Sequence, residues 1–219
     1  MNKDFWIKRW NDNHIGFNQA SINKNLTKYF ESMNLKQTDD VFVPLCGKSV
    51  DMLFFSQKNH HVIGVELSEK ALDEFFDENN VLCDVKEESD FVKYSAINMD
   101  LYGGDFFKIT QDQMKNVGLV YDRASLIALP LEMRKKYVDH LVKILPEGCK
   151  LLLLTVVYDQ NEMSGPPHSV SREEVDSLFG EYFSVRLLEN RTVLSENKKF
   201  EDRGLTSLEE DIYLIKKIK

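Results

Sequence analysis

The spacing of hydrophobic residues changes along the chain at about residue 40. Between Ser21 and Met33, apolar side chains recur every three or four residues, which predicts a helix. A shorter helix is expected over residues 4–10, where Trp6 and Trp10 lie four positions apart and share one face. Beyond residue 40, short apolar runs alternate with amphipathic stretches, which predicts an α/β fold with a parallel-rich sheet.

We expect seven strands, at 41–45, 62–66, 98–102, 118–122, 150–158, 183–188 and 212–217, of which 98–102 has the weakest apolar pattern. Helices are expected between them at 49–57, 68–78, 130–145 and 172–179, with Ser68 as an N-cap and Pro130 at a helix start. Neither a repeat nor a long Pro/Gly/Ser linker interrupts the pattern. We therefore predict one domain over residues 1–219.

Composition and charge narrow the function classes. Of 219 residues, 42% are hydrophobic and 29% charged, as in globular proteins, and the net charge of −8 disfavours a nucleic-acid partner. Cys46, Cys83 and Cys149 are odd in number and form no CxxC pair, so we expect neither disulfides nor a metal site. The absence of a signal-peptide pattern or membrane-length apolar run predicts a cytoplasmic protein without a membrane partner.

Parallel sheets bind ligands at the carboxyl ends of their strands, so the residues that follow each strand deserve inspection. Residues 44–51 read Pro-Leu-Cys-Gly-Lys-Ser-Val-Asp, and Gly-Lys-Ser suggests a phosphate-binding loop. That motif needs a glycine five positions before Gly47, where this chain has Phe42, so we reject it. Gly47 still permits a ligand to approach the backbone closely.

Two acidic residues at strand ends point to a nucleoside. Glu66 follows Gly47 by 19 residues, close to the spacing at which a carboxylate accepts hydrogen bonds from ribose hydroxyls. Asp105 ends the next expected strand, where its carboxylate can accept from an exocyclic amine and Phe106 or Phe107 can cover a base. Taken alone, each signal also fits ordinary strand-end or turn chemistry.

Several motifs together resemble the thiopurine S-methyltransferase family. They are, in chain order, Trp10, Gly16-Phe17, residues 43–52, 64–68, 104–107, 121–124, 128–130, 133–134 and 165–167. The matches extend from about Phe5 to Leu214. The resemblance implies a three-layer, Rossmann-like class I methyltransferase fold. That fold has a mostly parallel seven-stranded sheet with helices on both faces, and an N-terminal helical lid is expected over residues 1–35.

The resemblance also implies the cofactor S-adenosylmethionine, with S-adenosylhomocysteine as product, and a site that can be read residue by residue. At the cofactor it places Trp10, Leu45, Glu66 and Arg123, with Asp105 and Phe106 on the adenine side. Trp6 and Phe17 match lid residues that close over cofactor and acceptor, and Arg203 aligns with an arginine near the acceptor. His168, also on the acceptor side, departs from the family's usual phenylalanine, so the identity of the acceptor stays open.

The implied chemistry is methyl transfer to the sulfur of an aromatic or heterocyclic thiol. Holding the reactants in line contributes up to about 10 kcal/mol, and a positive charge beside the forming thiolate stabilises it. Arg123 and Arg203 are the candidates for that charge, while the aromatic faces of Trp6, Trp10 and Phe17 suit a sulfonium. Selenium or tellurium oxyanions or halides are alternative acceptors, and a non-catalytic cofactor-binding module is the alternative class. The family resemblance favours a monomer.

Overall fold

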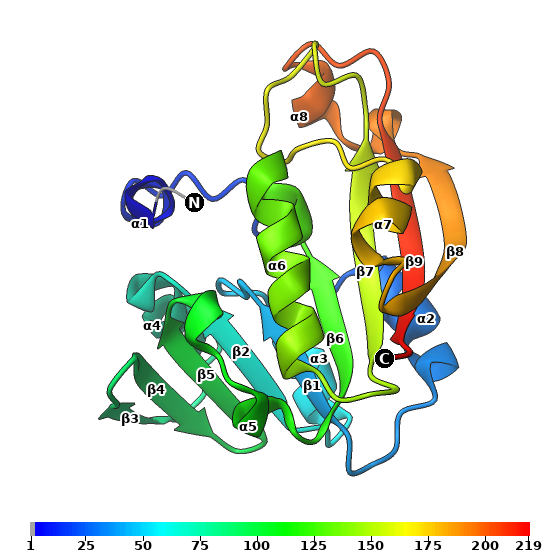
Figure 1. The fold of residues 1–219 in the computed structure, drawn as a ribbon. Coiled ribbons are helices and arrows are strands. Elements are labelled where there is room, and N and C mark those ends of the chain that lie inside the picture. The colour runs from blue at the N-terminus through cyan, green and yellow to red at the C-terminus, as the bar shows by residue number, and fades with distance from the viewer. Residues whose placement is uncertain (1–2) are drawn as a thin grey trace. The chain divides into compact units, whose positions relative to one another are not determined.

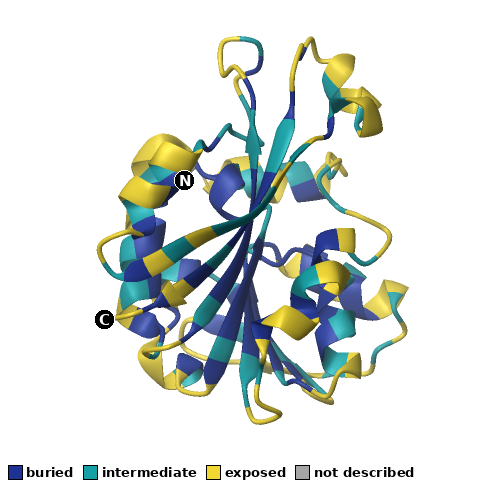
Figure 2. Cartoon of the chain, turned by 90° about the vertical axis from the view of Figure 1, so that its right-hand side faces the viewer, coloured by how far each residue is buried: buried dark blue, intermediate teal, exposed yellow. Residues whose placement is uncertain are grey.

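The computed structural model describes residues 3–219, which fall into two compact units, residues 3–121 and residues 122–219 (Figure 1). We call them the N-terminal unit and the C-terminal unit. Alternating strands and helices dominate both units, as the hydrophobic pattern predicts. Most of the strands are buried over more than half of their length, whereas the helices keep exposed residues on one side (Figure 2).

Parallel strands form the sheet of the N-terminal unit. β1 (Asp40–Pro44), β2 (Val62–Glu66), β5 (Met99–Gly104) and β6 (Val117–Arg123) pair in parallel, and the last two residues of β6 belong to the C-terminal unit. The strand order is β3-β4-β5-β2-β1-β6. All five residues of β2 are buried, so this strand lies in the interior of the unit.

Two strands were not expected from the sequence. β4 (Phe91–Ala96) pairs antiparallel with β5, and β3 (Asp84–Glu87) pairs antiparallel with β4 at the edge of the sheet. Residues 3–219 therefore contain nine strands, and the expected count of seven is corrected. The reason is physical: all four residues of β3 are exposed, so no apolar run marks the strand.

The helices of the N-terminal unit bury one face each. They are α1 (Lys3–Asn11), α2 (Lys24–Tyr29), α3 (Asp51–Gln57), α4 (Glu69–Glu78) and α5 (Gln111–Met114), with 3-10 turns η1 (Phe30–Met33) and η2 (Phe106–Lys108). In α4 the buried residues are Ala71, Leu72, Phe75 and Phe76, spaced as an amphipathic helix requires. Ser68 occupies the N-cap of α4 as predicted, although its side chain makes no capping bond.

The C-terminal unit has an antiparallel sheet of β7 (Lys150–Val157), β9 (Glu209–Lys217) and β8 (Phe183–Thr192), in that order. Its helices are α6 (Leu131–Ile144), α7 (Arg172–Phe179) and α8 (Lys198–Glu201), with 3-10 turns η3 (Leu126–Ala128) and η4 (Leu194–Glu196). β8 is longer than predicted and its register shifts between Leu187 and Glu189. None of the helices in residues 3–219 has the length and apolarity needed to cross a membrane.

Candidate active site

The turn between β1 and α3 has an unusual backbone. We call residues 44–49 the Gly47 loop. Leu45 has a φ of 45° and Gly47 a φ of 51°, both in the left-handed region that favours glycine. The Cys46 amide donates to the Val65 carbonyl at 3.0 Å, which ties the loop to β2. Burial raises the pKa of the Cys46 thiol well above its ordinary value, so this side chain is a neutral packing group.

Glu66 joins the two loops that follow β1 and β2. Its side-chain oxygens accept hydrogen bonds from the amides of Gly47 and Ser68, each at 2.9 Å. The residue is buried, which raises the pKa of its carboxyl, while the surrounding amides act in the opposite direction. A carboxylate oxygen has a second lone pair, so Glu66 retains capacity for a hydroxyl donor. The strand-end argument therefore led to a residue that organises this edge of the sheet.

Asp105 follows β5 and starts the η2 turn. Its carboxylate accepts from the Phe107 amide at 3.1 Å and pairs with the Lys3 ammonium at 2.8 Å. Partial burial alone would raise the pKa of Asp105, but the bonds from Lys3 and Phe107 outweigh it and hold the pKa below its ordinary value. Phe106 is buried and stacks on Phe42 with 6.3 Å between ring centroids, whereas Phe107 is only half-buried.

An aromatic cluster of Trp6, Trp10 and Phe17 lies on α1 and the segment that follows it. Phe17 meets both indoles edge-on, with ring centroids 5.8 Å from Trp6 and 5.4 Å from Trp10. The Trp10 indole covers Gly47, because a Cβ at Gly47 would lie only 2.8 Å from Trp10 Cζ2. Trp10 is 3% exposed. The structure thus brings the three predicted aromatic residues together and places one of them on the Gly47 loop.

Arg123 ends β6, beside a buried carboxylate. Asp122 accepts from the amides of Ser125 and Leu126, at 3.2 and 3.0 Å, and from the Tyr137 hydroxyl at 2.7 Å. Burial raises the pKa of Asp122 to about 6, although these hydrogen bonds oppose the shift. The bonds fix the turn that follows Arg123, which is half-buried.

Arg203 follows α8 and belongs to a group of cations. Its guanidinium lies 5.7 Å from the centroid of the Phe200 ring, and the Lys199 ammonium lies 5.2 Å from the same centroid. The pKa of Lys199 is lowered by partial burial and by the positive charges of Arg203 and Arg123. In the C-terminal unit, Lys199 therefore lies within electrostatic reach of both Arg123 and Arg203. We call these three residues the cation cluster.

His168 lies in a different environment within the same unit. Its backbone amide donates to the Ile127 carbonyl at 2.7 Å, and its ring packs where a Cβ on Gly165 would stand. Burial, together with the positive charge of Arg134, lowers the pKa of His168. The imidazole is therefore neutral at pH 7, and it adds no positive charge to the cation cluster.

The predicted residues divide between the two units. Trp6, Trp10, Phe17, Leu45, Glu66, Asp105 and Phe106 lie in the N-terminal unit, and Arg123, His168 and Arg203 lie in the C-terminal unit. Sequence reasoning missed Lys199, whose signal is its position four residues before Arg203. It also missed Lys3 and Lys70, whose partners are distant in sequence. Residues 3–219 hold no group of three or more metal-ligating side chains.

Comparison with solved structures identifies the fold class. A SAM-dependent methyltransferase from Anabaena variabilis superposes with a TM-score of 0.67 and 14% identity, covering 99% of this chain and 95% of that one. A 1,6-didemethyltoxoflavin-N1-methyltransferase from Burkholderia thailandensis, solved with S-adenosylhomocysteine, gives a TM-score of 0.66 at 11% identity and covers 99% and 87%. The chain has the class I methyltransferase fold, as predicted.

Comparison of sequences identifies the family. The family model "Thiopurine S-methyltransferase (TPMT)" matches residues 1–218. Thiopurine S-methyltransferases of Nitrosospira multiformis and Pseudomonas fluorescens are each 44% identical, over 215 residues (98% of both chains) and 216 residues (99% of both). The chain belongs to the thiopurine S-methyltransferase family, whose members are S-adenosylmethionine-dependent enzymes.

Proposed function

We propose that this enzyme transfers a methyl group from S-adenosylmethionine to the sulfur of an aromatic or heterocyclic thiol, as in thiopurine S-methylation. The observation that carries the proposal is the family match over residues 1–218. The cation cluster supports it, because a thiolate acceptor is an anion. As part of the same proposal, residues 1–219 form one monomeric, cytoplasmic methyltransferase domain with residues 1–35 as its lid.

The N-terminal unit has side chains that suit the cofactor. The Glu66 carboxylate is buried at a strand end and has lone pairs for ribose hydroxyls, beside a Gly47 backbone that carries no side chain. Asp105 and Phe106 serve the adenine side, and Leu45 adds an apolar contact from the loop. Trp6, Trp10 and Phe17 present aromatic faces, which attract a cation. When bound, the cofactor supplies an electrophilic methyl group on a sulfonium.

The C-terminal unit has side chains that suit the acceptor. Aromatic thiols are partly ionised near neutral pH, so the thiol proton passes to solvent and no general base is required. Arg123 and Arg203 stay charged and stabilise the thiolate as it is held for attack, and Lys199 adds to the same field. The thiolate charge and the sulfonium charge cancel when the new carbon–sulfur bond forms and the old one breaks. His168 lines the acceptor side as a neutral group.

The test is incubation with labelled S-adenosylmethionine and 6-mercaptopurine. We expect labelled thioether from the wild-type chain and a large loss in Glu66→Ala and Arg123→Ala. Arg186→Ala is the matched control, because Arg186 is exposed on β8 and is not part of the proposed site. Methyl transfer by the wild-type chain that is no greater than transfer by Glu66→Ala and Arg123→Ala would overturn the proposed activity.

A second acceptor class deserves a test, because the cation cluster favours small anions as well as thiolates. Selenium or tellurium oxyanions and halides are soft or anionic nucleophiles of that kind. Cells that express the enzyme are grown with tellurite, and volatile methylated products are measured in the headspace. Methylated tellurium, together with weak turnover of the thiol, would assign the enzyme to this alternative. Binding of S-adenosylhomocysteine without turnover on either class would instead indicate a non-catalytic module.

A further inference from the structure

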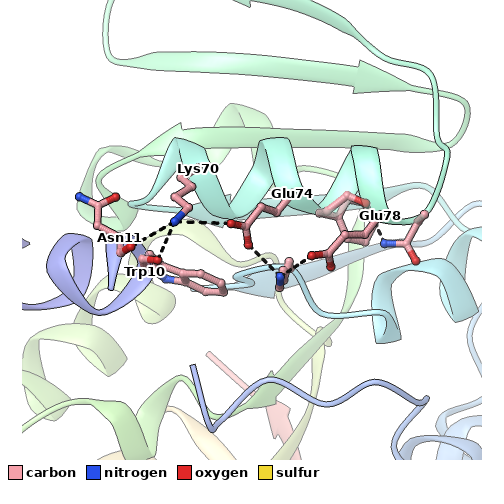
Figure 3. Close-up of polar contacts among 8 residues, drawn as sticks. Trp10, Asn11, Lys70, Glu74 and Glu78 are labelled. Carbon is pink, nitrogen blue, oxygen red and sulfur yellow. Dashed lines mark hydrogen bonds and ion pairs between the residues drawn. The ribbon is translucent and has the colours of Figure 1, made fainter. Parts of the chain in front are cut away.

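A chain of charged groups connects α1 to the Gly47 loop, and the proposed function leaves it unexplained. Lys70, on α4, donates from Nζ to the carbonyl oxygens of Trp10 at 3.1 Å and Asn11 at 3.3 Å (Figure 3). These carbonyls belong to the last two residues of α1, where the helix itself supplies no i+4 donor, and the Trp10 carbonyl also accepts from the Asn13 amide at 3.2 Å. A cation at this end also suits the helix dipole. Lys70 therefore caps a helix from another element, 60 residues away.

The same lysine belongs to a network of ion pairs in which only one member, Lys48, is buried. Lys70 Nζ lies 3.6 Å from one oxygen of Glu74, and the other oxygen of Glu74 accepts from Lys48 at 2.7 Å. Glu78 also accepts from Lys48, at 2.6 Å (Figure 3). The Lys48 side chain is only 8% exposed. Burial would lower the pKa of Lys48, but the bonds to Glu74 and Glu78 raise it above its ordinary value, so the ammonium stays charged.

Two members of this network adjoin Trp10. Lys70, at one end, holds the Trp10 backbone through its carbonyl. Lys48, which lies between Glu74 and Glu78, is the neighbour of Gly47, and the Trp10 indole rests on Gly47. One run of four charged side chains thus contacts the backbone of Trp10 and includes the neighbour of Gly47, on which the Trp10 ring lies. An exposed i,i+4 pair such as Lys70–Glu74 contributes little on its own. Here, however, Glu74 also pairs with the buried ammonium of Lys48, and removing a partner from a buried charge is costly.

We propose that Lys70, acting through Glu74 and Lys48, is a positioning residue that holds the Trp10 indole on the Gly47 loop and thereby sets the affinity for the cofactor. The second half of this inference rests on the proposed role of Trp10 at the cofactor. The first half does not, because it concerns only where the indole lies.

The experiment uses Trp10 as its own reporter. The chain has two tryptophans, so Trp6→Phe leaves Trp10 as the single source of indole emission. In that background Lys70→Met keeps the aliphatic stem and removes the ammonium. We expect the Trp10 emission to move to longer wavelength as the buried ring gains water, and the Kd for S-adenosylhomocysteine to rise roughly tenfold. Lys70→Arg, which keeps a donor for both carbonyls, should restore most of both signals. Glu74→Gln should cause a smaller shift in emission and a smaller rise in Kd than Lys70→Met does.

Lys135→Met is the matched control, because Lys135 forms an exposed i,i+4 pair with Asp139 on α6. We expect it to change neither emission nor affinity. In turnover assays Lys70→Met should raise the KM for the cofactor more than it lowers kcat, whereas a purely structural role would lower only the unfolding midpoint. Unchanged Trp10 emission and unchanged Kd in folded Lys70→Met would overturn the inference. A wild-type chain that binds no S-adenosylhomocysteine would overturn the proposed function instead, while the emission shift still tests the position of Trp10.

Discussion

Replacing Gly47 by alanine tests the contact between α1 and the Gly47 loop. Gly47 has a φ of 51°, and the added Cβ would lie 2.8 Å from Trp10 Cζ2 and 3.2 Å from Trp10 Cη2. Two costs follow. The left-handed backbone costs about 1–2 kcal/mol for a residue with a Cβ. Displacing a buried indole from a packed position costs about 1–3 kcal/mol more.

Gly148→Ala separates these two costs. Gly148 has a φ of 78°, and its Cβ would meet no atom of residues 3–219 within 4 Å. It therefore reports backbone strain alone, of about 1–2 kcal/mol. We expect Gly47→Ala to lower the free energy of unfolding by about 1–3 kcal/mol more than Gly148→Ala does. Urea denaturation of both variants measures the difference.

Cofactor affinity supplies the second measurement. Titration calorimetry with S-adenosylhomocysteine should show weaker binding to Gly47→Ala, because the displaced indole no longer covers the loop. Gly148→Ala should bind as tightly as the wild-type chain. Equal destabilisation of the two variants, with no loss of affinity in Gly47→Ala, would refute the inferred contact between Trp10 and Gly47.

Three further predictions follow from the described contacts. Glu66→Gln replaces one acceptor oxygen by an NH2 donor that faces a backbone amide. We therefore expect S-adenosylhomocysteine to bind at least roughly tenfold more weakly in calorimetry. An unchanged Kd would contradict the proposed role of Glu66 at the ribose. Burial raises the pKa of the Asp122 carboxyl from 3.8 to about 6 in the folded state, so the folded state binds the carboxyl proton more tightly than the unfolded state does. The resulting contribution to the free energy of unfolding is about 3 kcal/mol. It is present below pH 4 and is lost as the pH rises through 6. Asp122→Asn should remove this pH dependence of the free energy of unfolding, which denaturation at several pH values measures. A difference in unfolding free energy between wild type and variant that stays constant with pH would contradict the prediction. Lys199→Met and Arg203→Met should each raise the KM for a carboxylate-bearing thiol more than for a neutral one, and equal effects on both substrates would exclude a charge-based role for the cation cluster.

The sequence could predict the strands that are buried and the positions of the acidic residues at their ends. β2 was predicted with its observed bounds because an unbroken apolar run fits no exposed element. The proximity of Glu66 to Gly47 could be predicted because it depends on a short spacing in the sequence, which one helix and one strand fix. The predicted pairing of Trp6 and Trp10 on one face also needed only local helical geometry, and their common contact with Phe17 agrees with it.

Other features depend on contacts that no local pattern encodes. β4 exists through its pairing with β5, and an exposed strand such as β3 has no hydrophobic signature. The bonds from Lys70 to α1 join residues about 60 positions apart, and a surface lysine on a helix gives no sign of such a partner. Lys199 could have been noticed from its spacing to Arg203, but its proximity to Arg123 required the fold of the C-terminal unit.

The exposed strand β3 has a consequence for how this protein behaves at high concentration. It lies at an edge of the sheet and offers unpaired backbone groups to any other chain. Three of its four residues, Asp84, Lys86 and Glu87, are charged, and the fourth, Val85, is 57% exposed. Charges on an edge strand oppose strand addition by a second molecule, because each would lose its hydration in the new interface. Neutralising Asp84, Lys86 and Glu87 would leave an apolar edge around Val85. The enzyme would then be expected to self-associate through added strands, while the fold of each chain stayed unchanged.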